Sequence, residues 1–335
     1  MELLPEIWRI MVPYLTLEHL NLFRLLSREL CEYAKDYEGN DEVASPYSLK
    51  LCLRCYPKLK RLNTDNCFVG CKDFNTFKRL EELSIKTEYI VRDKLFAPCV
   101  KLKKLNISSN YFHQYTNLDF ILKDLPQLTH LSMSNVSNIT DEVFHGSNQL
   151  QSLELSGRCR ITSLGILQLN HLKKLCIDRI NLGQSQIQDH AFEGLPIEEL
   201  VIHYHEFITD RGICHLKQLR KVVCVQVPHV QGEGWDALKK LETIGFGSIV
   251  LNRVSNFKMA KTLSFHECRI LGPWRGLWTK LEKLRVHNTT FEYPDSIKTI
   301  MCPRLRKIRI IRCRQMMDYE DLLCKTFGKK VSILL

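Results

Sequence analysis

A short phrase that recurs along the chain limits what this protein can fold into. The phrase is leucine, two polar residues, leucine, one further residue and an aliphatic residue, and it returns about every 22 residues. Stacked units of this kind bury a continuous core that no single unit could form alone. The sequence therefore predicts an elongated scaffold that presents a surface, and not an enzyme built around a pocket. The twelve copies start at Leu59, Leu80, Leu102, Leu128, Leu150, Leu172, Ile197, Leu219, Leu241, Ala260, Leu281 and Leu305.

Each phrase predicts a short strand whose leucines point inward, because side chains alternate between the two faces of a strand. Helix starts follow several strands, where a hydroxyl or carboxylate can cap a helix, as in Ile139-Thr140-Asp141, Ile161-Thr162-Ser163 and Ile208-Thr209-Asp210. Three residues past some strands lies a small polar residue that can bond the backbone as the chain turns: Cys67, Asn110, Cys268 and Cys313. Parallel strands inside and wider helices outside would make the stack curve into a horseshoe. The predicted fold class is thus α/β, with parallel strands on the concave face and helices on the convex face.

The first part of the chain has a different pattern. Residues 4 to 36 favour three helices, with Pro5 in the first turn, Thr16 as the cap of the second helix and Ser27 as the cap of the third. The polar stretch from Asp36 to Ser45 is the best linker candidate. We therefore expect a helical domain over residues 1–40 and a repeat domain of about 12 repeats over residues 41–335.

These two regions resemble a known family. The repeats resemble leucine-rich repeats of the cysteine-containing kind, with their I-T-D/S turns and the entry Cys302-Pro303. Residues 4 to 36 resemble an F-box in its opening Leu4-Pro5, in Ile7 and Ile10, in Tyr14-Leu15, in Leu20 and in Leu26-Ser27-Arg28. Two features depart from that pattern: Leu30 replaces a tryptophan often found there, and the usual Leu-Trp just downstream is missing.

The resemblance implies an F-box/leucine-rich-repeat protein, the substrate receptor of a Skp–cullin–F-box ubiquitin ligase. Such a subunit is not an enzyme, and it raises the effective concentration of a target near the ubiquitin-carrying enzyme. Two alternatives stay open: the helices only cap the first repeat, or the protein is an interaction scaffold outside any ligase. The expected adaptor-binding residues are Leu4, Pro5, Ile7, Ile10, Leu15, Leu20, Leu26 and Leu30.

A target site is expected on the outward strand positions of the later repeats. The middle of this ladder is apolar at Val201, Val223 and Val225, with His203 and Tyr204 beside them. Its end is basic, so the face suits a target with a hydrophobic segment followed by acidic or phosphorylated residues. The alternative is that these cations only keep the surface soluble. The expected basic residues are Lys283, Arg285, Lys307, Arg309 and Arg312.

Composition limits the remaining possibilities. No segment reaches the ~18 unbroken apolar residues of a membrane helix, so no membrane partner is expected. The N-terminus lacks the pattern of a secretory signal, and cysteines at apolar repeat positions suit reduced thiols in the cytoplasm or nucleus. The net charge of +11 permits nucleic acid, but no basic aromatic motif supports that partner. Ordinary burial explains the zinc-like spacing of Cys52, Cys55, Cys67 and Cys71, so no metal or other cofactor is expected.

Overall fold

The computed structural model describes residues 40–43, 58–65, 78–87, 96–109, 121–137, 139–146, 149–180, 186–313, 315 and 331–334. The predicted F-box helices, with all eight expected adaptor-binding residues from Leu4 to Leu30, lie outside these ranges. So do Cys52, Cys55, Cys67 and Cys71, which carry the zinc-like spacing.

All twelve copies of the sequence phrase form strands, and each strand begins at the third residue of its copy. The predicted strands are therefore confirmed. They are β2 (Arg61–Asp65), β3 (Glu82–Thr87), β4 (Lys104–Ser109), β5 (His130–Ser134), β6 (Ser152–Ser156), β7 (Lys174–Asp178), β8 (Glu199–His203), β9 (Lys221–Val225), β10 (Thr243–Gly247), β12 (Thr262–His266), β15 (Lys283–His287) and β18 (Lys307–Ile311).

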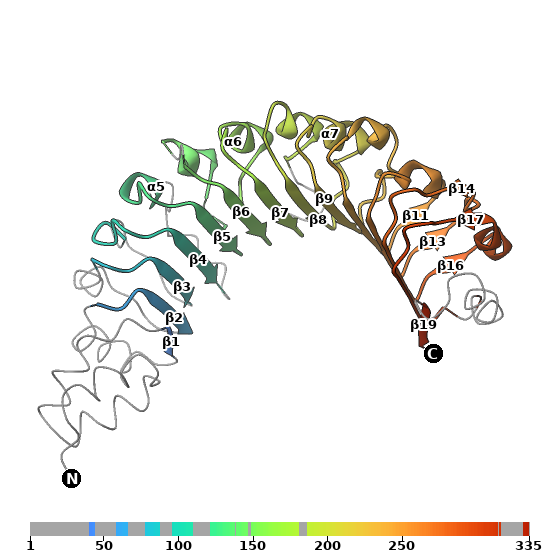
Figure 1. Ribbon diagram of the computed structural model, residues 1–335. Helices are drawn as coiled ribbons and strands as arrows, with labels where there is room; N and C mark the ends of the chain where they lie inside the picture. Colours follow the sequence, from blue (N-terminus) through green and yellow to red (C-terminus); the bar gives the residue numbers. More distant parts are fainter. Residues whose placement is uncertain are drawn as a thin grey trace, which may run out of the picture. The chain divides into compact units, whose positions relative to one another are not determined.

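The chain divides into two compact units, residues 1–161 and 162–335, which we call unit 1 and unit 2. In unit 1, β1 (Asn40–Val43) and β2 to β6 pair in parallel in sequence order. In unit 2, the strands likewise pair in parallel, in the order β7, β8, β9, β10, β12, β15, β18 and β19 (Val331–Leu334) (Figure 1). The pairings between the twelve copies join equivalent positions of neighbouring repeats, which is the register that a repeated phrase predicts. The strands β1 and β19 are not copies of the phrase, and β1 lies within the stretch from Asp36 to Ser45 that was predicted to be a linker.

The core of each unit is a set of columns of equivalent aliphatic residues. In unit 1 Leu83, Leu105, Leu131 and Leu153 are register partners and are at most 3% exposed. Because the repeats stack on one another, Leu105 and Leu131 are each covered by counterparts on both sides. Aromatic rings fill part of the core of unit 2, where Trp235, Phe246, Phe257, Phe265, Trp274, Trp278 and Phe291 lie in contact along the stack.

The predicted outer helices are present, but each is only three to six residues long. Thr140, Thr162 and Thr209 cap them as predicted, each hydroxyl accepting a hydrogen bond from the backbone N–H two residues later. Each segment therefore contains only one or two helical turns. They are α5 (Ile121–Asp124), η3 (Asp141–Phe144), α6 (Ser163–Leu167), η4 (Asp189–Phe192), α7 (Asp210–Cys214), η5 (Trp235–Ala237), η6 (Val254–Phe257) and η7 (Pro294–Thr299), where η marks a 3-10 helix.

Two small parallel sheets accompany the 3-10 helices in later repeats of unit 2. One contains β11 (Val250–Leu251), β13 (Arg269–Ile270) and β16 (Thr290–Phe291), and the other contains β14 (Gly276–Leu277) and β17 (Ile300–Met301). The repeated phrase does not predict these sheets, because their strands lie outside its copies.

The strands of unit 2 end in a repeated left-handed turn. Tyr204 and Gln226, each directly after a strand, have φ of 55° and 51°, and their N–H groups donate to Val225 O and Gly247 O of the next strand at 2.8 Å. A side chain in this conformation costs about 1 kcal/mol or more, and the bond to the next repeat offsets that cost. Beyond the turn, the Cys268 and Cys313 thiols donate to the backbone oxygens of His266 and Ile311, as predicted.

Candidate functional site

The side chains of the unit 2 ladder that point away from the core form one surface, which we call the open face. Its middle row runs through register partners along the ladder. Since the core columns fix the register, the sequence alone determines which outward side chains become neighbours. The row contains Cys176, Val201, Val223, Gly245, Ser264, Arg285 and Arg309.

The apolar part of the open face lies on β8 and β9. Val201 is the register partner of Val223, and His203 is the partner of Val225. All four side chains are half-buried, so they form a surface that is packed but still accessible. The structure therefore brings together these four of the predicted target-binding residues.

Tyr204 stands at the edge of this apolar part in a fixed position. An Arg179 Nη2 donates to its hydroxyl at 3.1 Å, and the Arg179 guanidinium carbon lies 4.3 Å from the ring centroid. Both residues occupy the left-handed turn position of consecutive repeats. A tyrosine held by a cation on its ring and by its own backbone loses little freedom when a partner binds.

A carboxylate beside His203 was missed by the sequence analysis. Asp178 Oδ1 lies 3.4 Å from His203 Nδ1, because Asp178 and His203 are register partners. The same oxygen lies 3.8 Å from Nε of the next residue, Arg179. Extending the outward ladder by two residues along each strand would have found both Asp178 and its neighbour Arg179. The three residues form a polar border to the apolar surface.

The basic part of the open face is a block of four cations on two adjacent strands. Lys283 is the register partner of Lys307, and Arg285 is the partner of Arg309. All four side chains are exposed. No carboxylate among the described residues lies within ion-pair distance of any of them. We call these four residues the basic block, and Arg312, also predicted, lies at the turn directly after β18.

The other cations on the outward faces of the strands, in both units, do have acidic neighbours wherever their side chains are described. Lys174 and Lys221 lie 2.9 Å and 3.8 Å from the carboxylate of Glu199, which stands between them. In unit 1, Arg61 and Lys104 lie 3.5 Å and 3.0 Å from Glu82 in the same way. Like charges opposite each other destabilise a sheet, so the basic block differs from the alternating pattern at a cost in stability.

Two imidazole rings lie next to the basic block. His266 and His287 are register partners, and their rings stack with centroids 4.4 Å apart. They occupy the row adjacent to Arg285 on the open face.

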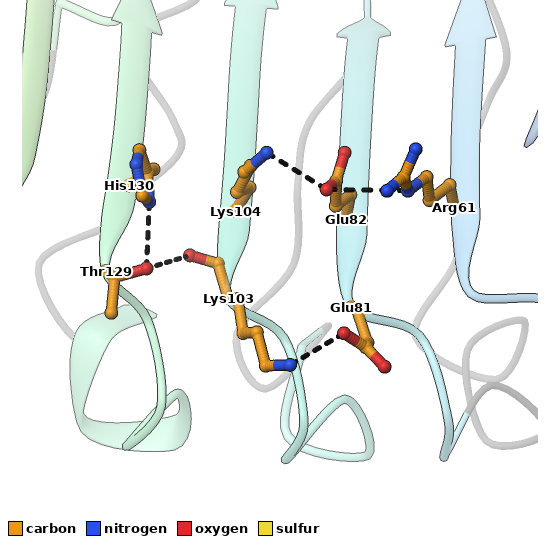
Figure 2. A network of polar contacts seen from close by, with 7 residues as sticks. All are labelled: Arg61, Glu81, Glu82, Lys103, Lys104, Thr129 and His130. Atoms are coloured by element: carbon orange, nitrogen blue, oxygen red, sulfur yellow. Dashed lines mark hydrogen bonds and ion pairs between the residues drawn. The ribbon is translucent and has the colours of Figure 1, made fainter.

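Unit 1 has a hollow of about 610 Å³ over its own outward strand positions. Figure 2 shows how Glu82 lies between Arg61 and Lys104, while Lys103 reaches Glu81 at 2.7 Å. This hollow was not predicted, because small polar residues on early strands are also typical of a solvated sheet. Both cations that line it, Arg61 and Lys104, pair with Glu82, unlike the cations of the basic block. The outward residues that line it are Arg61, Asn63, Glu82, Ser84, Lys104, Asn106, His130, Ser132, Ser152 and Glu154.

Reactive chemistry has little support in the described residues. No group of three or more histidines, cysteines, aspartates or glutamates that could hold a metal ion is found among them. Burial raises the pKa of the Cys99 and Cys302 thiols to about 12, which disfavours the reactive thiolate. None of the described helices is long and apolar enough to cross a bilayer.

Solved structures share this fold. A leucine-rich-repeat protein of Leptospira interrogans matches with a TM-score of 0.57 and 17% identity, over 92% of this chain and 80% of that one. An internalin, InlF, of Listeria monocytogenes matches with a TM-score of 0.56 and 16% identity, over 90% of this chain and 81% of that one. The functional domain of InlJ from the same species gives 0.53 and 15%, over 85% and 70%.

These likenesses identify the fold as that of leucine-rich-repeat proteins. At such identities they say nothing about what the protein binds. The sequence itself matches no protein-family model and no curated protein.

Proposed function

We propose that this protein is a non-catalytic interaction module that binds a partner protein on the open face of unit 2. The observation that carries the proposal is the basic block, whose four exposed cations have no acidic neighbour in the described structure. A protein gains no stability from such an arrangement, so an external anion is its natural complement.

The apolar part of the open face supports the same assignment. Interfaces depend on a few well-packed anchors, among which tyrosine and arginine are common. Tyr204 and Arg179 are held against each other by two contacts, and Val223 and Val225 lie on the neighbouring strand. Apolar anchors give affinity while the cations give orientation and a fast encounter.

Site-specific photocrosslinking tests this assignment. A photoreactive amino acid at Val223, on the open face, should capture a discrete partner when the full chain is expressed in its native cell type. The control is the same amino acid at Leu277, which is 50% exposed on β14 and lies outside the ladder. Capture of the same partner at Leu277 but not at Val223 would refute the open face as the binding surface.

A second candidate function rests on the N-terminal sequence. The F-box resemblance of residues 4–36 favours a substrate receptor that joins a Skp-family adaptor and, through it, a cullin. The partner on the open face would then be a ubiquitination target, and the protein would act in the cytoplasm or nucleus. Tethering a target near the ubiquitin-carrying enzyme needs no chemistry from the receptor itself.

An adaptor pull-down decides between this role and a scaffold outside any ligase. Full-length protein should retain a recombinant Skp adaptor, and Leu15→Asp should abolish that binding by placing a charge in the apolar contact. The matched control is Arg309→Glu, which changes unit 2 and should leave adaptor binding intact. Failure of the unmodified protein to bind the adaptor would eliminate the ligase role and leave the interaction module.

A further inference from the structure

Between the apolar part of the open face and the basic block lies β10, which has glycines at two of its outward positions. Gly245 lies between Val223 on β9 and Ser264 on β12, and Gly247 lies between Val225 on β9 and His266 on β12. A Cβ at Gly245 would lie 3.1 Å from Ser264 Oγ, so the neighbouring side chains lean over the bare strand. Neither glycine has a positive φ, so backbone strain does not explain their presence.

The spacing along the ladder sets the length of chain that could cross it. From β9 to β15 there are three steps between adjacent strands, by way of β10 and β12. At about 4.8 Å a step the distance is about 14 Å, which an extended peptide at about 3.3 Å per residue covers in about four residues. An aliphatic side chain against Val223 and an anionic one at Arg285 would therefore be about four residues apart.

The basic block favours a phosphate over a single carboxylate. Arg285 and Arg309 are exposed register partners on adjacent strands, and Lys283 and Lys307 flank them in the same way. A phosphorylated side chain carries about two negative charges and three acceptor oxygens, enough to bond two guanidinium groups at once. One carboxylate would leave most of the block's charge without a complement.

We infer that the open face binds an extended segment of the partner protein, with an aliphatic residue on Val223 and Val225 and a phosphorylated serine or threonine on Arg285 and Arg309, about four residues apart. The segment crosses β10 above Gly245 and Gly247. This inference rests on the proposed function and adds the chemistry and spacing of the bound segment.

Nucleic acid fits these observations less well. Its backbone needs a basic stripe along many strands, and single strands also need aromatic platforms. Here the basic block covers two strands, and Glu199 neutralises Lys174 and Lys221 farther along the open face. On the strands of the open face, the described cations that lack an ion pair are therefore confined to β15 and β18.

An oriented peptide library tests the inference directly. The full-length protein is immobilised and incubated with peptides that carry one fixed phosphoserine among randomised positions, and with the same library carrying serine. Phosphopeptides should be enriched at least about tenfold over serine peptides, because charge-assisted bonds to two arginines are lost without the phosphate. Leucine, isoleucine and valine should be selected four or five residues from the phosphoserine, on one side.

Variants assign the effect to the basic block. The double variant Arg285→Glu/Arg309→Glu should lose the phosphate preference, while Arg275→Glu, an exposed arginine beside β14, should keep it. No phosphate preference, or an aliphatic preference equal at all distances, would overturn the inference. Tight binding of a single-stranded RNA oligonucleotide, lost in the double variant, would replace it with a nucleic-acid site.

The outcome also separates this inference from the proposed function. If Val223 still crosslinks a partner while the library shows no phosphate selection, the bound segment has a different chemistry and the interaction surface stands. If Val223 captures nothing and the library shows no selection, both are wrong.

Discussion

Reversing the charge of Arg309 should make the fold more stable while it weakens binding. Arg309 is the register partner of Arg285, and no carboxylate among the described residues compensates this repulsion. In Arg309→Glu the repulsion disappears and an attractive cross-strand pair takes its place. Each of these effects is worth about 0.2–1 kcal/mol for exposed pairs in a sheet, so the free energy of unfolding should rise by about 0.5–1.5 kcal/mol.

A matched reversal elsewhere on unit 2 should have the opposite sign. Lys261 Nζ lies 2.6 Å from Glu242 Oε1, and this hydrogen bond lowers the pKa of Glu242 below its usual value. Lys261→Glu removes the pair and sets two carboxylates side by side, so it should lower stability by up to about 1 kcal/mol. Because both changes replace an exposed cation with glutamate, the difference in sign isolates the local charge environment.

Urea unfolding followed by tryptophan fluorescence is the appropriate assay. Trp235, Trp274 and Trp278 are buried in unit 2, so the signal reports mainly on the unit that carries both variants. The gain in stability of Arg309→Glu should be largest at about 20 mM salt and should shrink at about 500 mM, since ions screen exposed charges. A lower midpoint for Arg309→Glu, or a shift that is the same at both salt concentrations, would refute the reasoning.

Two further predictions concern polar groups of unit 2, the buried His205 and the half-buried Asp210. Burial lowers the pKa of His205 from 6.5 to about 4 and its Nδ1 accepts a hydrogen bond from Phe207 N–H, so below pH 6.5 the unfolded chain takes up a proton that the folded chain does not. The free energy of unfolding should therefore fall by up to about 3 kcal/mol between pH 6.5 and 4. The variant His205→Asn keeps a hydrogen-bond acceptor but does not take up this proton, so its urea midpoint should fall much less over the same pH range. The Asp210 carboxylate accepts bonds from Gln231 N–H and Gly232 N–H at 2.8 and 2.7 Å, so Asp210→Ala should cost about 2–3 kcal/mol in urea unfolding. The exposed Asp236→Ala is its control, and an equal effect of both changes would contradict this account.

The sequence predicted the ladder well, because the repeated phrase fixes both strands and register. Once Leu175, Leu200 and Val222 form one column, Val201 and Val223 must be neighbours on the other face. The threonine caps were also predictable, since a hydroxyl before a helix start is a local signal. A cap marks only where a helix begins, however, so the expected convex helices came out as one- or two-turn segments.

Other features of the site depend on contacts that a pattern of residue types does not encode. The bond from Arg179 to Tyr204 requires two left-handed turns to place both side chains at one edge. The difference between the basic block and other open-face cations depends on which glutamate stands on the adjacent strand, as Glu199 does beside Lys174. The sequence showed the cations, and the register showed which of them have acidic neighbours.

The most direct test of the account compares photocrosslinking from the two outward faces. The photoreactive amino acid is placed either at Val223 in unit 2 or at Asn106, which is exposed in the hollow of unit 1. The account predicts that the partner is captured from Val223, that Arg285→Glu/Arg309→Glu reduces this capture at least about tenfold, and that Asn106 captures far less. Efficient capture from Asn106, unchanged by the two reversals in unit 2, would contradict it.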